Sequence, residues 1–180
     1  MEDLSLHILD IAENSISAGA RNITITLRED AANDLLRVEI ADDGSGMSED
    51  VVARAADPFY TTRSTRRVGL GLALLHEAAR MANGSLEISS APGRGTTVKA
   101  ALQMSHIDRK PLGNMAETVI ALIAMHAGVD ILYEHTRDGK LIAFDTKEVR
   151  NELGGASLNT VEALSVIREY LNQEEESLAQ

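Results

Sequence analysis

The sequence predicts an α+β fold, and two hydrophobic periodicities carry that prediction. Apolar residues recur at helical spacing from Leu4 to Ile16, as in a helix that packs one face on a core. Ile23, Ile25 and Leu27 then alternate with polar residues, which is typical of a half-buried strand. Glycine-containing turns separate the later segments, so helices and strands are mixed along the chain rather than grouped.

The remaining elements are expected in the order in which their patterns occur. The first are a strand ending at the "DDGSGM" loop, a short helix after Ser48, and a helix that begins at about Gly71 and ends at Asn83-Gly84. Strands at 85–90 and 96–103 follow, and then an apolar helix over Met115–Ala127. The last are a hairpin of 129–134 with 140–145, which turns at Asp138-Gly139, and a helix from Asn159 with Glu162 in a capping box. The composition shifts near residue 105. We therefore expect two parts, 1–104 and an α-β-β-α extension over 105–180 of unknown role, and we expect the acidic tail to fray.

Composition excludes several classes of function. The 180 residues carry a formal net charge of −11 and only 3 % aromatic residues, which argues against a nucleic-acid partner. The chain has no cysteine, so disulfides and thiolate metal sites are ruled out. Its N-terminus does not resemble a signal peptide, and the longest apolar segment is too short to span a bilayer. We expect a cytoplasmic protein that does not act at a membrane.

Three glycine-rich segments offer the elements of a nucleotide site. In "DDGSGM", the Asp42 carboxylate could accept a hydrogen bond from an exocyclic amine while Gly44 and Gly46 let a flat ring approach the backbone. In "VGLGLALLHEA", Gly69 and Gly71 precede a helix whose N-terminal N–H groups could bind phosphate. "GRGTTV" adds a turn and threonine hydroxyls. Each segment alone is more often an ordinary tight turn, but their order and spacing together point to a site.

With these motifs in this order, the sequence resembles the GHKL superfamily of gyrase, heat-shock chaperone, histidine kinase and mismatch-repair ATPases. "DIAENSISAGA" resembles the N box, "DDGSGM" the first glycine box, "DPFYTTR" the F box, "RRVGLGLAL" the second glycine box and "GRGTTV" the last. The likeness covers about residues 4–102 and is closest to the catalytic domain of bacterial sensor histidine kinases. It implies a two-layer α/β sandwich, the Bergerat fold, that binds ATP or ADP with Mg²⁺.

The resemblance also implies roles for individual residues. Asn14 would coordinate Mg²⁺ bridging the phosphates, and Asp42 would bind the adenine amino group. The segment up to Gly71 would form a lid over the nucleotide, with Phe59 as its aromatic latch unless it is ordinary core. One of Arg63, Arg66 and Arg67 would contact phosphate, and the others would lie in a solvated loop. The full set of implied nucleotide-binding residues is Asn14, Asp42, Gly44, Gly46, Met47, Phe59, Arg63, Gly69, Leu70, Gly71, Leu72, Thr96 and Thr97.

Asp10 lies one helical turn before Asn14 and on the same face of the first helix. Hydrolytic and serine-kinase members of the superfamily carry an acidic general base at this position, whereas histidine kinases usually carry an amide. We therefore predict Asp10 as a general base, with a solvated polar face as the alternative. Aspartate is one methylene shorter than the usual glutamate, so its reach depends on the geometry.

"SHIDRKPL", residues 105–112, resembles the phosphoacceptor box of sensor kinases, which would make His106 a phosphoacceptor. It follows the kinase-like region instead of preceding it, and Ile107 replaces the acidic neighbour of the family. A linker, with Pro111 preparing the next helix, is therefore the favoured interpretation. We expect an ATPase domain that stands alone, without the usual N-terminal phosphoacceptor domain.

Two functions follow from this reading. The first is a Mg-ATP-binding enzyme that hydrolyses ATP or phosphorylates a protein partner as a stand-alone histidine-kinase-like regulator. The second is a non-catalytic, nucleotide-gated module that docks a partner protein. Asp10 with Asn14 favours the enzyme, and the expected lack of a phosphoacceptor domain favours the module. A DNA-acting repair or topoisomerase fragment is disfavoured by length and charge, and a homodimer stays open.

Overall fold

The computed structural model describes residues 3–55 and 70–178 and contains a sheet covered by helices on one face. The elements are α1 (Leu4–Ser17), β1 (Asn22–Asp30), β2 (Leu35–Asp42), α2 (Glu49–Ala55), α3 (Gly71–Met81), β3 (Ser85–Ser90), β4 (Thr96–Gln103), α4 (Met115–Met125), β5 (Asp130–Arg137), β6 (Lys140–Asp145), α5 (Thr146–Glu152) and α6 (Val161–Leu178). The strands form one sheet in the order β3-β4-β2-β1-β5-β6. The predicted α+β, two-layer architecture is confirmed.

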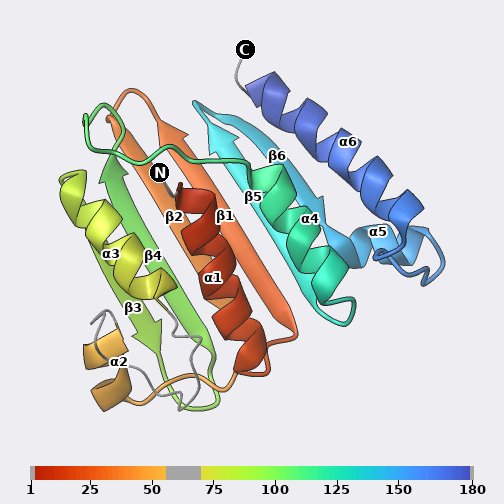
Figure 1. Cartoon of the computed structure of the whole chain (residues 1–180), viewed down its shortest axis with the longest axis horizontal. Coiled ribbons are helices and arrows are strands. Elements are labelled where there is room, and N and C mark those ends of the chain that lie inside the picture. Colours follow the sequence, from red (N-terminus) through yellow and green to blue (C-terminus); the bar gives the residue numbers. More distant parts are fainter. Residues whose placement is uncertain (1–2, 56–69, 179–180) are drawn as a thin grey trace.

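Alternation along the strands explains why only one face of the sheet is covered. Ile23, Ile25 and Leu27 of β1 are buried, and their neighbours in the sequence turn to the opposite face. Residues of the same face on β2, β4 and β5 continue this apolar layer. Helices α1, α3, α4 and α6 pack on it, with α3 over β3 and β4 and with α6 alongside β6 (Figure 1).

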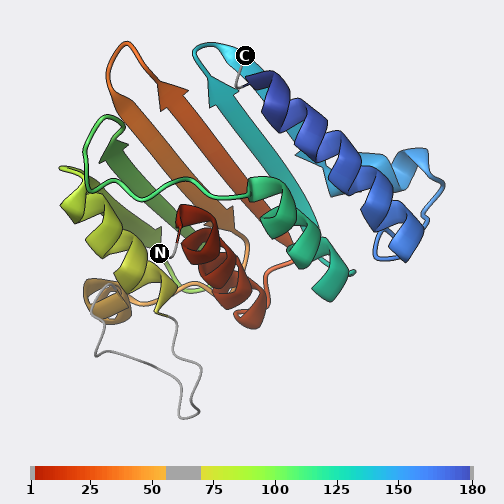
Figure 2. The same cartoon turned by 45° about the horizontal axis from the view of Figure 1, so that its top comes forward.

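The N-terminal helix α1 lies at the centre of the helical layer. Asp3 caps it by accepting a hydrogen bond from the N–H of Leu6, and Leu4 and Ile8 are fully buried beneath it. Its C-terminus is followed by Gly19 with a φ of 83°. The segment between β4 and α4 crosses above the start of α1, where Leu4 N–H donates to the Pro111 carbonyl (Figure 2).

The hairpin of β5 and β6 completes the same sheet. β5 pairs with β1 in parallel over eight residues, from Asn22 with Asp130 to Glu29 with Arg137, and all other neighbours are antiparallel. The turn at Asp138-Gly139 is as predicted. The expected parts 1–104 and 105–180 therefore share one sheet, and the boundary at residue 105 is a division of the sequence that the sheet crosses.

The C-terminal helices differ from the sequence expectations in three details. A short helix, α5, follows β6 directly because Asp145 caps it through the N–H of Lys147. The last helix is capped by Thr160, whose hydroxyl accepts from the Ala163 N–H, and Asn159 lies outside it. The acidic tail does not fray, since α6 continues to Leu178, which is buried against the core.

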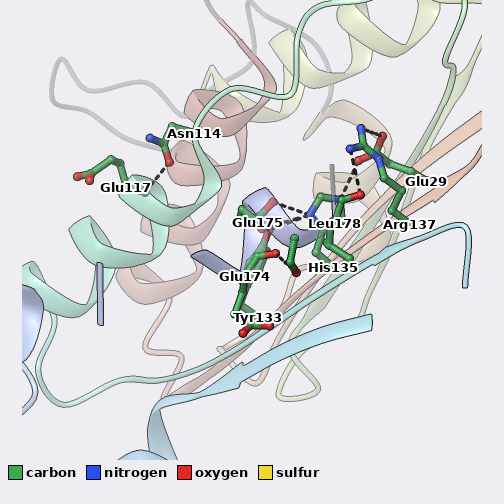
Figure 3. Close-up of polar contacts among 10 residues, drawn as sticks. Glu29, Asn114, Glu117, Tyr133, His135, Arg137, Glu174, Glu175 and Leu178 are labelled. Atoms are coloured by element: carbon green, nitrogen blue, oxygen red, sulfur yellow. Dashed lines mark hydrogen bonds and ion pairs between the residues drawn. The ribbon is translucent and has the colours of Figure 1, made fainter. Parts of the chain in front are cut away.

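A buried polar cluster fastens the end of α6 to the sheet (Figure 3). His135 of β5 is only 2 % exposed and lies between two carboxylates, with Nε2 2.9 Å from Glu29 and Nδ1 2.9 Å from Glu175. Tyr133 donates its hydroxyl hydrogen to Glu175, and Arg137 donates to Glu29 at 2.9 Å. Every polar side chain of the cluster is thus paired, which is what makes its burial tolerable.

The two carboxylates control the protonation of His135. Burial by itself lowers the pKa of the ring, but hydrogen bonds to Glu175 and Glu29 and their negative charges outweigh that effect and raise the pKa to about 9. The hydrogen bond from His135 in turn holds the pKa of Glu29 below its ordinary value. At neutral pH His135 is therefore a charged imidazolium, and it lies between the carboxyl groups of Glu29 and Glu175.

This arrangement predicts a stability that declines at alkaline pH. Because the folded pKa of His135 lies above the ordinary value of 6.5, its stabilising contribution is complete below pH 6.5 and is lost as the pH rises through about 9. The loss amounts to at most about 3.5 kcal/mol, because the folded pKa lies about 2.5 above the ordinary value and each pKa unit corresponds to about 1.4 kcal/mol. Urea unfolding at a series of pH values measures it, with His135→Gln as the variant that cannot be charged. An equal pH dependence in both proteins would contradict the assignment to His135.

Candidate functional site

Asp42, the predicted adenine-binding residue, ends β2 and is held by hydrogen bonds from three directions. Its Oδ1 accepts from the N–H of Gly44 at 2.9 Å and from the N–H of Thr96 at 3.2 Å. Its Oδ2 accepts from the hydroxyl of Ser15 at 2.6 Å. A carboxylate has about four acceptor positions. Donors of the described residues fill both positions of Oδ1 and one of Oδ2, so Oδ2 can accept one more hydrogen bond from an outside group.

Ser15 was missed by the sequence analysis, although it orients the Asp42 carboxylate. It follows Asn14 on α1 and is buried on the apolar side of the helix, one turn after Ile11. A polar residue on the apolar stripe of an amphipathic helix was the available signal, because a buried hydroxyl needs a partner. The partner itself was not predictable, since Asp42 lies 27 residues along the chain.

The first glycine box, which contains Asp42, lies against the turn that leads into the last one. Gly46 has a φ of 67°, and a Cβ atom there would lie 1.9 Å from the carbonyl oxygen of Ala91. Only glycine lets the loop after β2 approach the turn between β3 and β4 so closely. Met47, half-buried beside it, donates its N–H to the hydroxyl of Ser90, which also lies 2.9 Å from the Thr96 hydroxyl.

Of the two threonines predicted at this end of the site, only Thr96 shares a face with the helices. It belongs to the alternation of Val98 and Ala100, which are buried in the core, and its N–H reaches Asp42. Thr97 alternates to the uncovered face of the sheet, opposite Ala41 in the β2–β4 register. The structure therefore brings Thr96, and not Thr97, into the group around Asp42.

The start of α3 lies against the polar side of α1. A Cβ atom added at Gly71 would be 2.7 Å from the Cβ of Asp10 and 3.3 Å from the carbonyl oxygen of His7, so glycine permits this close approach of the two helices. The N-cap residue Leu70 makes no side-chain hydrogen bond to the first turn of α3, which also lacks acidic residues. This N-terminus, with its positive dipole end, is therefore suited to an anion.

Asp10 and Asn14 follow each other by one turn along α1, with Asp10 exposed and Asn14 half-buried. Asp10 is thus brought to the start of α3, while Asn14 lies nearer Ser15 and the end of α1. Leu72 is half-buried in the first turn of α3. These residues are thus distributed along α1, with Gly71 against its middle at Asp10 and Asp42 bonded to Ser15 near its C-terminus.

Three of the predicted site residues lie outside the described residues. They are Phe59, Arg63 and Gly69, together with the neighbouring Arg66 and Arg67. Their roles in a lid stay predictions. Among the residues that are described, no cluster of three or more histidine or acidic side chains could hold a metal ion. Magnesium bound through one amide oxygen, water and phosphate needs no such cluster, so Asn14 fits the implied metal.

His106 is not brought to this group. It lies in a turn after β4, beyond the pair Leu35–Gln103, whereas Asp42 pairs with Thr96 at the opposite end of the same two strands. Seven residue steps along β2 correspond to about 23 Å. Its Nδ1 accepts from the N–H of Asp108 at 3.2 Å, so the neutral ring carries its proton on Nε2 and lacks a free lone pair there. Its role as phosphoacceptor stays a prediction without geometric support.

Comparisons with known proteins identify the family of most of this chain. Residues 2–106 match the family model described as histidine kinase-, DNA gyrase B- and HSP90-like ATPase. The chain is 37 % identical over 110 residues to the sensor protein kinase FleS of Pseudomonas aeruginosa, covering 61 % of this chain and 27 % of that protein. It is also 37 % identical over 112 residues to the non-motile and phage-resistance protein of Caulobacter vibrioides, covering 57 % and 13 %. The chain thus spans between 13 % and 27 % of the length of these two relatives.

The chain also resembles a solved structure in its fold. The N-terminal domain of a DNA repair protein superposes with a TM-score of 0.55 at 15 % identity, covering 81 % of this chain and 53 % of that one. The superposition reaches beyond the segment matched by the family model, into the C-terminal part. Within the described ranges, no helix has both the length and the apolar composition needed to cross a membrane.

Proposed function

Because the chain belongs to the family of histidine kinase-, DNA gyrase B- and HSP90-like ATPases, we propose that Mg-ATP binds between α1, the end of β2 and the start of α3. At the level of the family, the chain is an ATP-binding, histidine-kinase-like protein. We propose further that it hydrolyses ATP or transfers the γ-phosphoryl group to a protein partner. The observation that carries the proposal is the Asp42 carboxylate, oriented by three donors and able to accept one more hydrogen bond.

The adenine ring would be recognised through Asp42. Its Oδ2 accepts the exocyclic amine, while Ser15 and the N–H groups of Gly44 and Thr96 fix the carboxylate. Guanine has a carbonyl oxygen in place of that amine, which would bring two acceptors together. This contact therefore supports adenine over guanine as the preferred base.

Replacing Ser15 tests how much this orientation contributes. Ser15→Ala removes the hydrogen bond to Oδ2 and is expected to weaken ATP binding about 5- to 10-fold, from a hydrogen bond to a charged group worth roughly 1 kcal/mol or more. Ser17→Ala, at the exposed end of the same helix, is the matched control and should bind as the wild type does. Isothermal calorimetry measures both. Equal ATP affinity in Ser15→Ala and wild type would remove Ser15 from the site.

The phosphates would lie between Asn14 and the N-terminus of α3. Asn14 would hold the magnesium ion through its amide oxygen, and the ion would neutralise phosphate charge. The N–H groups at the start of α3 would contact the phosphate oxygens. If Asn14 supplies the protein ligand, Asn14→Ala removes the Mg²⁺ dependence of nucleotide binding.

Asp10 is the proposed general base. In hydrolysis, its carboxylate takes a proton from the attacking water as the water oxygen bonds to the γ-phosphorus. The bond between the γ-phosphorus and the bridging oxygen breaks, and ADP leaves with that electron pair. In phosphoryl transfer, a hydroxyl or other nucleophile of the partner replaces the water. The closeness of Asp10 to the start of α3 supports this role.

The second candidate is a nucleotide-gated module without turnover. Residues beyond 106 lie outside the family match yet add two strands to its sheet, which suits a segment that presents a surface to a partner. Incubation of the protein alone with [γ-³²P]ATP separates the two candidates. Steady release of phosphate supports the enzyme, whereas tight binding without release supports the module.

The same incubation tests His106. An acid-labile, alkali-stable label that disappears in His106→Gln would make it a phosphoacceptor, and absence of such a label leaves it in the linker. Given the separation of about 23 Å along β2, labelling within one chain is not expected. The proposal also includes a protein partner, a cytoplasmic location and a homodimer.

A further inference from the structure

β6 is an edge strand without the central charge or proline that commonly protects such a strand against pairing. On its outer side it pairs with no strand of the described residues. Its sequence, Lys140–Asp145, has charges only at its two ends and Leu-Ile-Ala-Phe between them, with no proline. Natural edge strands are commonly blunted by a central charge, proline or a covering element. The other edge, β3, has Glu87 in its middle and α2 against it (Figure 1).

Helix α6 provides an apolar wall beside this edge. Tyr170 packs against Phe144 of β6 with ring centroids 6.1 Å apart, and both line a narrow groove between the strand and the helix that has no room for a water molecule. Val166 lies one turn before Tyr170 and is 68 % exposed, and Leu141, on the face of β6 that is turned away from α6, is 59 % exposed. Three of the chain's five aromatic residues line this groove. Tyr133 and Phe144 are buried, whereas Tyr170 is 43 % exposed, so Tyr170 and Val166 are the apolar side chains of α6 that a partner can reach.

The charges around the groove select the partner. Glu162 and Glu174 lie one turn beyond Val166 and Tyr170 on the same side of α6, so the apolar stripe ends in a carboxylate at each end. α6 carries five glutamates and one arginine, Arg168, which pairs with Glu117 of α4. The whole chain has a net charge of −11. A second copy would bring the same acidic helix to the groove, whereas a basic segment would be attracted.

We propose that β6 and α6 form a docking surface for an extended segment of a basic partner protein. The segment pairs as an additional strand with β6, places apolar side chains against Val166 and Tyr170, and sets basic side chains near Glu162 and Glu174. This surface lies at the β6 end of the sheet, beyond β1 and β5 from Asp42, so the proposal does not depend on nucleotide binding.

The hairpin geometry identifies the backbone groups that would pair. The two-residue turn at Asp138-Gly139 makes Arg137 and Lys140 a hydrogen-bonded pair, and such pairs alternate along an antiparallel ladder. Ala143 and Glu134, three positions from the turn pair, form one of the intervening pairs that are not hydrogen-bonded. The N–H of Ala143 is therefore directed away from β5. Proline at position 143 would block a new strand without removing a hydrogen bond to β5.

The probe is an end-capped nine-residue peptide that alternates valine with lysine, titrated calorimetrically at physiological salt without ATP. We expect it to bind at least tenfold more tightly than a peptide that alternates valine with glutamate, and to slow amide hydrogen exchange at Ala143. Ala143→Pro should lower its affinity at least tenfold.

A charge-matched pair of variants keeps the test valid if Ala143→Pro fails to fold. Glu174→Gln removes a carboxylate that lines the groove, and Glu176→Gln removes an exposed one two residues further along, which does not face it. Only the first should weaken peptide binding. Equal effects of the two, absence of peptide binding, or binding unchanged in Ala143→Pro would each overturn the proposal. A dimer seen by light scattering that Ala143→Pro abolishes would do so too, because the occupant would then be a second copy.

Discussion

Replacing Asp10 with asparagine is expected to leave ATP binding intact and to lower phosphate release by about 10²- to 10⁴-fold. Asparagine preserves the shape of the side chain but cannot take the proton of the attacking nucleophile, and general base catalysis commonly contributes a factor of that size. The position of Asp10 beside Gly71, at the start of α3, is the reason to expect it close to the terminal phosphate.

Asp10→Glu is the matched variant for this measurement. It keeps the carboxylate and extends it by one methylene, so turnover should persist or rise if reach is limiting. Steady-state release of phosphate and calorimetric ATP affinity are measured for all three proteins. Equal turnover in the wild type and Asp10→Asn would return Asp10 to the polar face of α1.

Asp42→Asn is expected to cripple ATP binding. If the amide oxygen keeps the hydrogen bonds from Gly44 and Thr96, the amide nitrogen replaces Oδ2 and presents a donor to the adenine amine, which is also a donor. The cost of about 1–3 kcal/mol or more corresponds to a loss of roughly 5- to 150-fold in affinity.

The neighbouring Asp43 supplies the control for Asp42. Its carboxylate points away from the site, accepting from the N–H groups of Arg21 and Asn22 at 2.7 and 2.9 Å. Asp43→Asn makes the same chemical change one residue away and should alter stability more than ATP affinity. Calorimetry and urea unfolding distinguish the two effects. ATP affinity unchanged in Asp42→Asn would move the adenine site elsewhere.

Local patterns were sufficient to predict much of the fold. The apolar stripe of α1, the alternation in β1 and the start of α3 at Gly71 depend on neighbours a few residues apart, and all three are observed. The order of the glycine boxes likewise predicts Asp42 and Gly46 as site residues, and their roles stay predictions. These are short-range signals, which a single sequence carries directly.

Contacts between distant residues were not accessible in this way. The Ser15–Asp42 hydrogen bond spans 27 residues, and His135 meets Glu29 across 106. The choice between Thr96 and Thr97 depended on the strand register, since a shift of one residue exchanges the faces. The sheet position of the C-terminal hairpin was likewise fixed by parallel pairing with β1, which no local turn specifies.

That parallel pairing has a consequence for how the chain folds during synthesis. β1 ends at Asp30 and its partner β5 begins at Asp130, so about 100 residues must be added before β1 can acquire its second neighbour. At roughly 5–20 residues per second, translation takes about 5–20 s over this stretch. During that interval β1, with its alternating isoleucines and threonines, is an uncovered edge that other nascent strands can pair with. The β1–β5 ladder joins residues that are far apart in the sequence, so it forms late. The sheet therefore stays open to misassembly at β1 until the C-terminal hairpin has been synthesised and has paired with it.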